Sequence, residues 1–289
     1  MSSQVYEVMN KEKIVGLLKL FRPKNALMST IGVLVGWFSV SREISLSLLL
    51  ACLVPPLILM AGNAINDYFD APIDAINKPD RPIPSGKISM REAFMSYTIL
   101  SFLGIFISSF LGIEEIVIAI FFSIAWYAYA RWIKALGIVG NALVSFGVAF
   151  TLIFGGLAAG TVDLKVILFS IIAFLSNMSR EIVKTIEDIE GDRAYGLHTV
   201  AVLLGLRGAG VLASVFSVLS SAVAIYPYLT GMVGIPYLTL TIIISIPLLL
   251  YAAILSLKVR SQRDARKISN YMKLSMFFGL LGMLADPLI

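Results

Sequence analysis

The chain has 289 residues, of which 58% are hydrophobic and only 14% are charged. Soluble domains are roughly 45 to 50% apolar and about 25% charged, so this composition excludes an ordinary soluble protein and indicates a chain that spans a membrane several times. The net charge of +5 does not indicate a nucleic-acid partner, because the basic residues are spread over short loops rather than gathered on one soluble face.

No polar block is long enough to form a second domain, so we expect a single transmembrane domain over residues 1–289, with a flexible cytoplasmic N-terminus over residues 1–15. This N-terminus lacks the apolar core and small-residue cleavage site of a signal peptide. The single cysteine, Cys52, lies in an apolar run and can form no intramolecular disulfide.

The expected fold is all-α, a polytopic membrane bundle of nine transmembrane helices. About 20 residues cross the hydrocarbon core of a bilayer, so the first and fourth of the nine apolar runs are short for a full span. The runs are residues 25–41, 46–66, 93–111, 115–131, 137–160, 164–184, 200–226, 235–257 and 271–288.

The lysines and arginines predict the orientation of these spans. With nine spans, 21 of the 23 basic residues fall on one side, and only Arg42 and Lys165 fall on the other. Cytoplasmic loops carry the excess of basic residues, so we expect an integral protein of the cell membrane with its N-terminus in the cytoplasm.

An acidic cluster follows the second span, with Asp67, Asp70 and Asp74 spaced i, i+3, i+7 and Asp80 a little further on. The first three share one face if the helix continues. Pro72 opposes this, because proline disfavours helical geometry at the preceding residue, and the helix is then expected to end before Asp74.

A second acidic cluster closes the sixth span on the same predicted side of the membrane. Asp188 and Asp192 are spaced i, i+4, and Glu181 and Lys184 extend that face backwards along the helix. Nine of the 18 acidic residues lie in the two clusters. They could be solvated loop residues with no role, but charges this close to lipid are usually functional, and their concentration favours a site.

Two opposed carboxylate faces repel each other unless cations lie between them. Mg²⁺ suits such a site, since it binds through a few carboxylates and completes its shell with water and substrate phosphates. The sequence therefore predicts a site for Mg²⁺ and a diphosphate. Nearby basic residues fit the phosphate oxygens; they are Arg81, Lys87, Lys134, Lys184 and Arg193.

These residues resemble a known family. Asn66-Asp67-x-x-Asp70-x-x-x-Asp74 resembles the first aspartate-rich signature of the UbiA superfamily of intramembrane prenyltransferases, and Asp188-x-x-x-Asp192 resembles the second. Tyr129-x-x-x-x-Lys134 is similar to the motif between them, although Ala130 and Ala135 replace residues that are usual there. The resemblance covers nearly the whole chain and implies a central cavity that opens toward the cytoplasmic side.

The resemblance also implies a function, the Mg²⁺-dependent transfer of a prenyl group from its diphosphate. It implies that Asp67, Asp70, Asp74, Asp188 and Asp192 hold the metal, that Asn66 helps to bind the diphosphate, and that Lys134 and Tyr129 contact the leaving group. The candidate catalytic residues are thus Asp70, Asp74, Asp188, Asp192, Lys134 and Tyr129.

The acceptor is indicated by the run from Asn77 to Ser89, which most resembles that of archaeal digeranylgeranylglyceryl phosphate synthases. Such enzymes join a geranylgeranyl group, taken from geranylgeranyl diphosphate, to the glycerol hydroxyl of geranylgeranylglyceryl phosphate. Chlorophyll synthases carry a similar run, so an aromatic, quinone or chlorophyll-type acceptor stays open. An ion-coupled secondary transporter is the alternative of another class, although transporters place their carboxylates near the midplane of the membrane.

Overall fold

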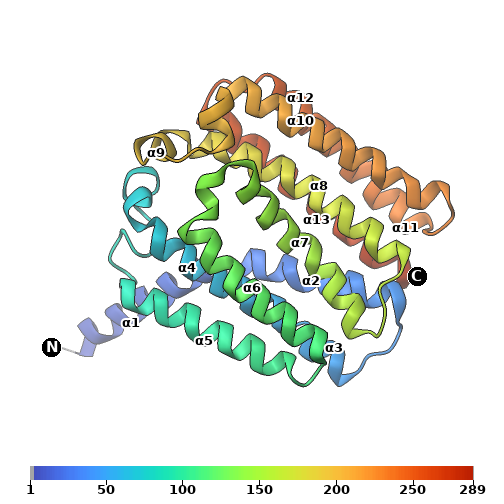
Figure 1. Ribbon diagram of the computed structural model, residues 1–289, viewed down its shortest axis with the longest axis horizontal. Helices are drawn as coiled ribbons and strands as arrows, with labels where there is room; N and C mark the ends of the chain where they lie inside the picture. The colour runs from blue at the N-terminus through green and yellow to red at the C-terminus, as the bar shows by residue number, and fades with distance from the viewer. Residues whose placement is uncertain (1–2, 289) are drawn as a thin grey trace.

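The computed structural model describes residues 3–288, and every regular element in that part of the chain is helical (Figure 1). The predicted all-α class is confirmed. In chain order the elements are α1 (Ser3–Phe21), α2 (Pro23–Val40), α3 (Leu46–Ala51), α4 (Val54–Asn77), α5 (Met90–Ser108), α6 (Ile113–Arg131), η1 (Ile133–Leu136), α7 (Ile138–Ala158), α8 (Leu164–Glu187), α9 (Ile189–Ala194), α10 (Val200–Leu229), α11 (Ile235–Tyr237), the π-helical η2 (Leu238–Ser245), α12 (Ile246–Leu257), α13 (Gln262–Ala285) and η3 (Asp286–Leu288).

Within residues 3–288, eight stretches are long and apolar enough to cross a membrane, and they match the predicted runs from 46–66 onward. The predicted run 25–41 corresponds to α2, which falls outside this set because its first turn carries Lys24 and Asn25. Residues 3–15 of the expected flexible N-terminus lie in α1, and residues 1 and 2 lie outside the described part of the chain.

Helix α4 continues through Pro72 to Asn77, so the expectation that this proline ends the helix before Asp74 is wrong. A proline removes one backbone donor, and here the surrounding bundle maintains the helix. The amide of Lys78 still donates to the carbonyl of Asp74 at 2.8 Å. The i, i+3, i+7 face of Asp67, Asp70 and Asp74 is therefore intact.

The second acidic cluster is divided by a break in the helix. Helix α8 ends at Glu187, Asp188 adopts φ −103° and ψ 7°, and α9 begins at Ile189. The amide of Asp192 donates to the carbonyl of Asp188 at 3.0 Å, so these two residues keep their helical spacing. Glu181 and Lys184 lie in α8 before the break, and Lys184 is close enough to Asp188 to act on its charge, whereas Asp192 lies beyond the break in α9.

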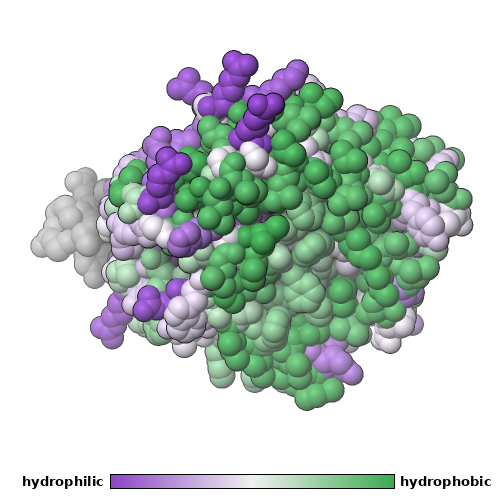
Figure 2. Space-filling model, turned by 45° about the horizontal axis from the view of Figure 1, so that its top comes forward, coloured by the Kyte–Doolittle hydropathy of each residue, from purple (hydrophilic) through white to green (hydrophobic). Residues whose placement is uncertain are grey.

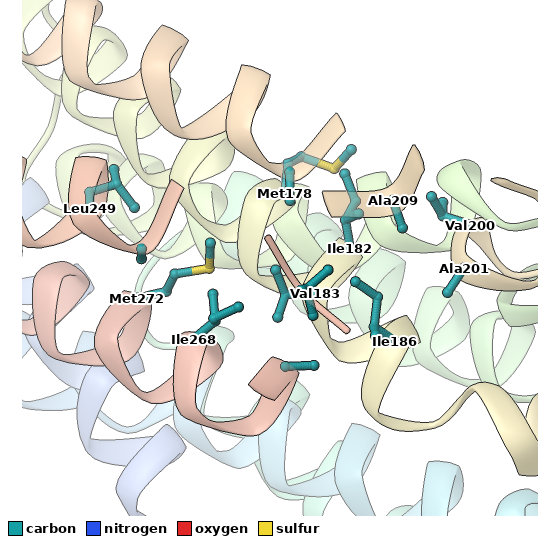
Figure 3. Close-up of a cluster of buried hydrophobic side chains, with 14 residues drawn as sticks. Met178, Ile182, Val183, Ile186, Val200, Ala201, Ala209, Leu249, Ile268 and Met272 are labelled. Atoms are coloured by element: carbon teal, nitrogen blue, oxygen red, sulfur yellow. The ribbon is translucent and has the colours of Figure 1, made fainter. Parts of the chain in front are cut away.

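One face of α8 is fixed by an apolar core. Its side chains at 178, 182, 183 and 186 are buried against α10, α12 and α13 (Figure 3). Met178, Ile182 and Ile186 follow one another at intervals of four residues, as the buried stripe of a helix requires. This core turns Asn177, Glu181 and Lys184 toward the interior of the bundle instead.

The outer surface is largely apolar, and its hydrophilic side chains gather toward the upper left in Figure 2. In Figure 1 the end of α4, the short α9 and helix α1 all lie toward the left-hand end of the bundle. The two acidic clusters are thus at one end of the bundle, since α9 packs beside α4.

Candidate active site

The carboxylates of Asp67, Asp70 and Asp74 are buried at the end of α4, with relative exposures of 3 to 4%. An ionised carboxylate is costly to bury unless it is paired. Each of the three is hydrogen-bonded to a basic side chain from another part of the chain. The helix therefore supplies a row of acids whose charge is compensated by distant residues.

Arg22 and Arg81 compensate the two outer members of the row. Arg22, between α1 and α2, binds Asp67 through one nitrogen and donates through the other to the side-chain oxygen of Asn63 at 3.0 Å. Arg81 lies in the loop after α4, which folds back so that Nη1 reaches Asp74 at 2.5 Å and Asp67 at 3.3 Å. Both arginines are more than two-thirds buried.

Asp70 accepts two hydrogen bonds on the same oxygen, Oδ2. Lys134 of η1 donates from Nζ at 2.6 Å, and Asn66 donates from its side-chain amide at 2.8 Å. Burial acts to lower the pKa of Lys134, but the carboxylate of Asp70 outweighs it, so the pKa is raised and the side chain stays charged. Asp192 and Asp188 also act on Lys134, which therefore lies between the two acidic clusters.

On the opposite side, Asp188 accepts a hydrogen bond from Nζ of Lys78 at 2.5 Å. Burial acts to raise the pKa of Asp188, but Lys78 outweighs it and the pKa is lowered. Asp192 is 3% exposed, and burial raises its pKa to about 6, a change that Lys134 opposes and Asp188 reinforces. The second cluster thus contains one carboxylate that is ionised at neutral pH, Asp188, and one that titrates close to neutral pH, Asp192.

The structure does not bring every predicted residue to this cluster. Lys184 binds Glu181 at 2.7 Å instead, and Arg193 is exposed on α9. Between described residues, no hydrogen bond or ion pair joins Lys87, Arg193 or Tyr129 to the five carboxylates. Tyr129 packs in the apolar core beside α4 and lies within electrostatic range of Asp70.

Sequence reasoning missed Arg22, Asn63 and Lys78 as members of the site. Arg22 is the one non-glycine residue between 3 and 288 with positive φ, 51°. The left-handed region is unfavourable for an L-residue and marks a position held by its surroundings, here by the contacts to Asp67 and Asn63. A basic residue directly before Pro23, on the same predicted side as the acids, was the signal available in the sequence.

These residues fit Mg²⁺ bound together with a diphosphate. Within the described part of the chain, no three His, Cys, Asp or Glu side chains converge into a ready-made metal cage. Mg²⁺ does not require one, because it takes one or two carboxylates and fills its shell with water and phosphate oxygens. Here four of the five carboxylates are paired with four basic side chains, which can turn to phosphate oxygens, and Asp192 lies beside Asp188.

A cavity of about 510 Å³ runs beside this cluster, between α2, α4, α6, α7, α8 and α13. Its walls are mostly apolar, and its polar residues include Arg22, which binds Asp67, and Asn63, which accepts a hydrogen bond from Arg22. This volume falls in the range of ligand pockets. Aromatic side chains contribute much of the wall; they are Phe122, Trp126, Phe150, Phe154 and Phe277.

Comparison with known proteins shows the family of the chain and solved structures that share its fold. Residues 26–280 match the UbiA prenyltransferase family. The digeranylgeranylglyceryl phosphate synthase of Korarchaeum cryptofilum is 54% identical over 95% of this chain and 98% of its own. A solved structure described as digeranylgeranylglyceryl phosphate synthase in membranes is 35% identical, with a TM-score of 0.74, and covers 96% of this chain and 99% of that one. A UbiA homologue from Archaeoglobus fulgidus, solved with DMAPP and Mg²⁺, has the same fold, with a TM-score of 0.65, 19% identity, and coverage of 93% and 99%.

Proposed function

The chain belongs to the UbiA prenyltransferase family, and we propose that it transfers a geranylgeranyl group from geranylgeranyl diphosphate to the glycerol hydroxyl of geranylgeranylglyceryl phosphate. The product is a digeranylgeranylglyceryl phosphate, an ether lipid precursor. The similarity over nearly the full length to the synthase of Korarchaeum cryptofilum supports this donor and this acceptor. The chain is a prenyltransferase, and not the ion-coupled transporter that the carboxylates alone also allowed.

The observation that carries the proposal is the meeting of two acidic clusters around Lys134 beside an apolar cavity. We assign Asp70, Asp74, Asp188 and Asp192, with Asp67 in support, to Mg²⁺. When bound, Mg²⁺ neutralises the charge that develops on the departing diphosphate. Lys134 lies where it can donate to the same leaving group, and Asn66 positions Asp70 through its hydrogen bond of 2.8 Å.

The reaction breaks the bond between the first prenyl carbon and the diphosphate oxygen, and the diphosphate leaves with the electron pair. The acceptor hydroxyl attacks that carbon, loses its proton and forms the ether. The apolar cavity excludes water from the allylic cation. Trp126 and Phe122 line this cavity, and their π faces are suited to a cation.

We also propose that α2 is the ninth span and that the chain lies in the cell membrane. The N-terminus, the carboxylate clusters and the cavity mouth beside them would then face the cytoplasm. The excess of lysine and arginine on that side supports this orientation.

Purified protein incubated with labelled geranylgeranyl diphosphate, Mg²⁺ and one acceptor at a time tests the function. We expect the label in an ether product with geranylgeranylglyceryl phosphate, and little with an aromatic acceptor. EDTA should stop the reaction, and added Mg²⁺ should restore it. Product only with an aromatic, quinone or chlorophyll-type acceptor would overturn the acceptor assignment.

A further inference from the structure

A second group of basic residues lines the large apolar cavity and is joined by no ion pair to the carboxylate row. Its members are Lys24 of α2, Arg180 and Lys184 of α8, and Lys273 of α13, and we call it the basic rim. Lys273 lies within electrostatic range of both Arg180 and Lys24, so the three helices bring their charges to one end of the cavity.

The basic rim carries more positive charge than its surroundings balance. Among the described residues that line the cavity, Glu181 is the one acid. Arg180 reaches it at 2.9 Å and Lys184 at 2.7 Å. Within the cavity lining, four basic residues therefore face one carboxylate, and from outside the lining Glu187 acts on Lys273 and Asp188 on Lys184. The cost of this excess falls mainly on Arg180, whose side chain is 14% exposed, and an anion that enters the cavity would lower it.

The hydrogen-bonding capacity of the basic rim is also unfilled. Within residues 3–288, no acceptor lies within hydrogen-bonding distance of the buried Nε of Arg180. Within the described part of the chain, Lys273 and Lys24 take part in no ion pair. A phosphate group offers several acceptor oxygens, and arginine binds phosphate with more than one hydrogen bond.

The basic rim adjoins the diphosphate site, since Lys184 acts electrostatically on Asp188. No ion pair between described residues joins its four members to Asp67, Asp70, Asp74, Asp188 or Asp192. Arg22 lies between the two groups, since it binds Asp67 and also lines the cavity. An anion on the basic rim would thus be a neighbour of the metal-bound diphosphate and not a part of it.

The cavity opens to the surface beside the basic rim. Lys24, Leu27 and Lys273 all line the cavity and are exposed. The mouth is charged at Lys24 and apolar at Leu27, three residues along the same helix. A lipid with one phosphate and an apolar tail matches that polarity.

We propose that the basic rim binds the phosphate of the lipid acceptor while its tail lies along the apolar wall. The proposal rests on the proposed function. In a glycerol phosphate the free hydroxyl lies no further from the phosphate than the length of the glycerol backbone. A phosphate held beside Arg22 therefore places that hydroxyl next to the donor, which is the positioning that a transfer reaction needs.

Lys273→Gln is the main test, because Lys273 makes no ion pair within the described chain and its loss leaves no partner unpaired. Lys267→Gln is the matched control, since Lys267 is exposed on the same helix and lies off the cavity. Initial rates are measured in nanodiscs of neutral lipid at saturating Mg²⁺, with geranylgeranylglyceryl phosphate and with its dephosphorylated alcohol.

For Lys273→Gln we expect KM for the phosphorylated acceptor to rise about tenfold, as the loss of a charged hydrogen bond implies. KM for the donor and the kcat/KM of the alcohol should stay within about twofold of the original protein. Lys273→Arg should recover most of the loss. Equal losses for both acceptors, a raised donor KM, or no change would each overturn the proposal.

Two further arms separate the remaining explanations. Thermal shift without donor or Mg²⁺ tests the basic rim independently of turnover: the phosphorylated acceptor should raise Tm more than the alcohol does, and Lys273→Gln should abolish that difference. If activity fails but this shift is seen, the proposed function is wrong and the phosphate site stands. The same Tm measurement is made with anionic bulk lipid in place of the acceptor. If Lys273→Gln abolishes the Tm shift caused by anionic lipid, and not the shift caused by the acceptor, the site binds a membrane headgroup and the proposal is overturned.

Discussion

Nζ of Lys78 lies 2.5 Å from Oδ1 of Asp188 and joins the end of α4 to the end of α8 across 110 positions of the chain. The contact ties together the two acidic clusters that we assign to Mg²⁺. It also places an ammonium group where a metal ion would bind. Lys78 and Mg²⁺ should therefore compete for Asp188.

We expect Lys78→Gln to bind Mg²⁺ several-fold more tightly in the absence of diphosphate. The metal then displaces no resident cation, and a partly exposed ion pair contributes about 1 kcal/mol at most. Titration of the purified protein with Mg²⁺ by calorimetry measures this effect. Lys87→Gln is the control, because no ion pair within residues 3–288 joins Lys87 to a carboxylate. Weaker Mg²⁺ binding by Lys78→Gln would contradict the competition.

Asp70→Asn should lower kcat by roughly a hundredfold or more, the usual cost of removing a group that stabilises charge in the transition state. The substitution keeps the size of the side chain and leaves Asn66 and Lys134 in place. Turnover is compared with the gel-filtration profile in detergent, which should be unchanged. Asp80→Asn serves as the control, since Asp80 is exposed. Near-normal turnover by Asp70→Asn would remove Asp70 from the metal site.

The enzyme should need a higher Mg²⁺ concentration for half-maximal activity in mild acid than at neutral pH. Burial raises the pKa of Asp192 to about 6, so this carboxyl is protonated below that pH and ionised above it. A metal ligand must be ionised, so apparent Mg²⁺ affinity should fall about tenfold for each pH unit below 6. Activity titrated with Mg²⁺ between pH 5 and 8 measures the effect. Asp192→Asn should remove this pH dependence of the Mg²⁺ affinity. If the original protein binds Mg²⁺ equally well from pH 7 to 5, Asp192 is not the titrating ligand.

Arg22→Gln should destabilise the protein by about 1 to 3 kcal/mol, because it weakens the pairing of a buried carboxylate and leaves Asn63 without its donor. Arg81 remains near Asp67 at 3.3 Å, which limits the loss. Thermal unfolding in detergent without Mg²⁺ measures the change. Arg42→Gln, on the exposed loop after α2, is the control. Equal Tm values for Arg22→Gln and the control would contradict a structural contribution from Arg22.

Much of the site followed from the sequence because its residues are close together along the chain. Asp67, Asp70 and Asp74 are spaced i, i+3, i+7, and Asp188 and Asp192 are spaced i, i+4, so each set recurs about once per helical turn. Helical periodicity alone predicts that each set lies on one face, and the placement of charge at the ends of apolar runs predicts that both sets lie on one side of the membrane. The all-α fold class and the prediction of a Mg²⁺ site needed no tertiary information.

The partners of those acids were decided only by the tertiary structure. Arg22, Lys78 and Lys134 come from three separate segments, and no local spacing relates them to the carboxylates they bind. The break at Asp188 is of the same kind: local spacing favoured one continuous face from Glu181 to Asp192, but α8 ends at Glu187, and Glu181 and Lys184 line the apolar cavity. Sequence determines which residues share a helix face, whereas packing of the helices against one another determines what that face meets.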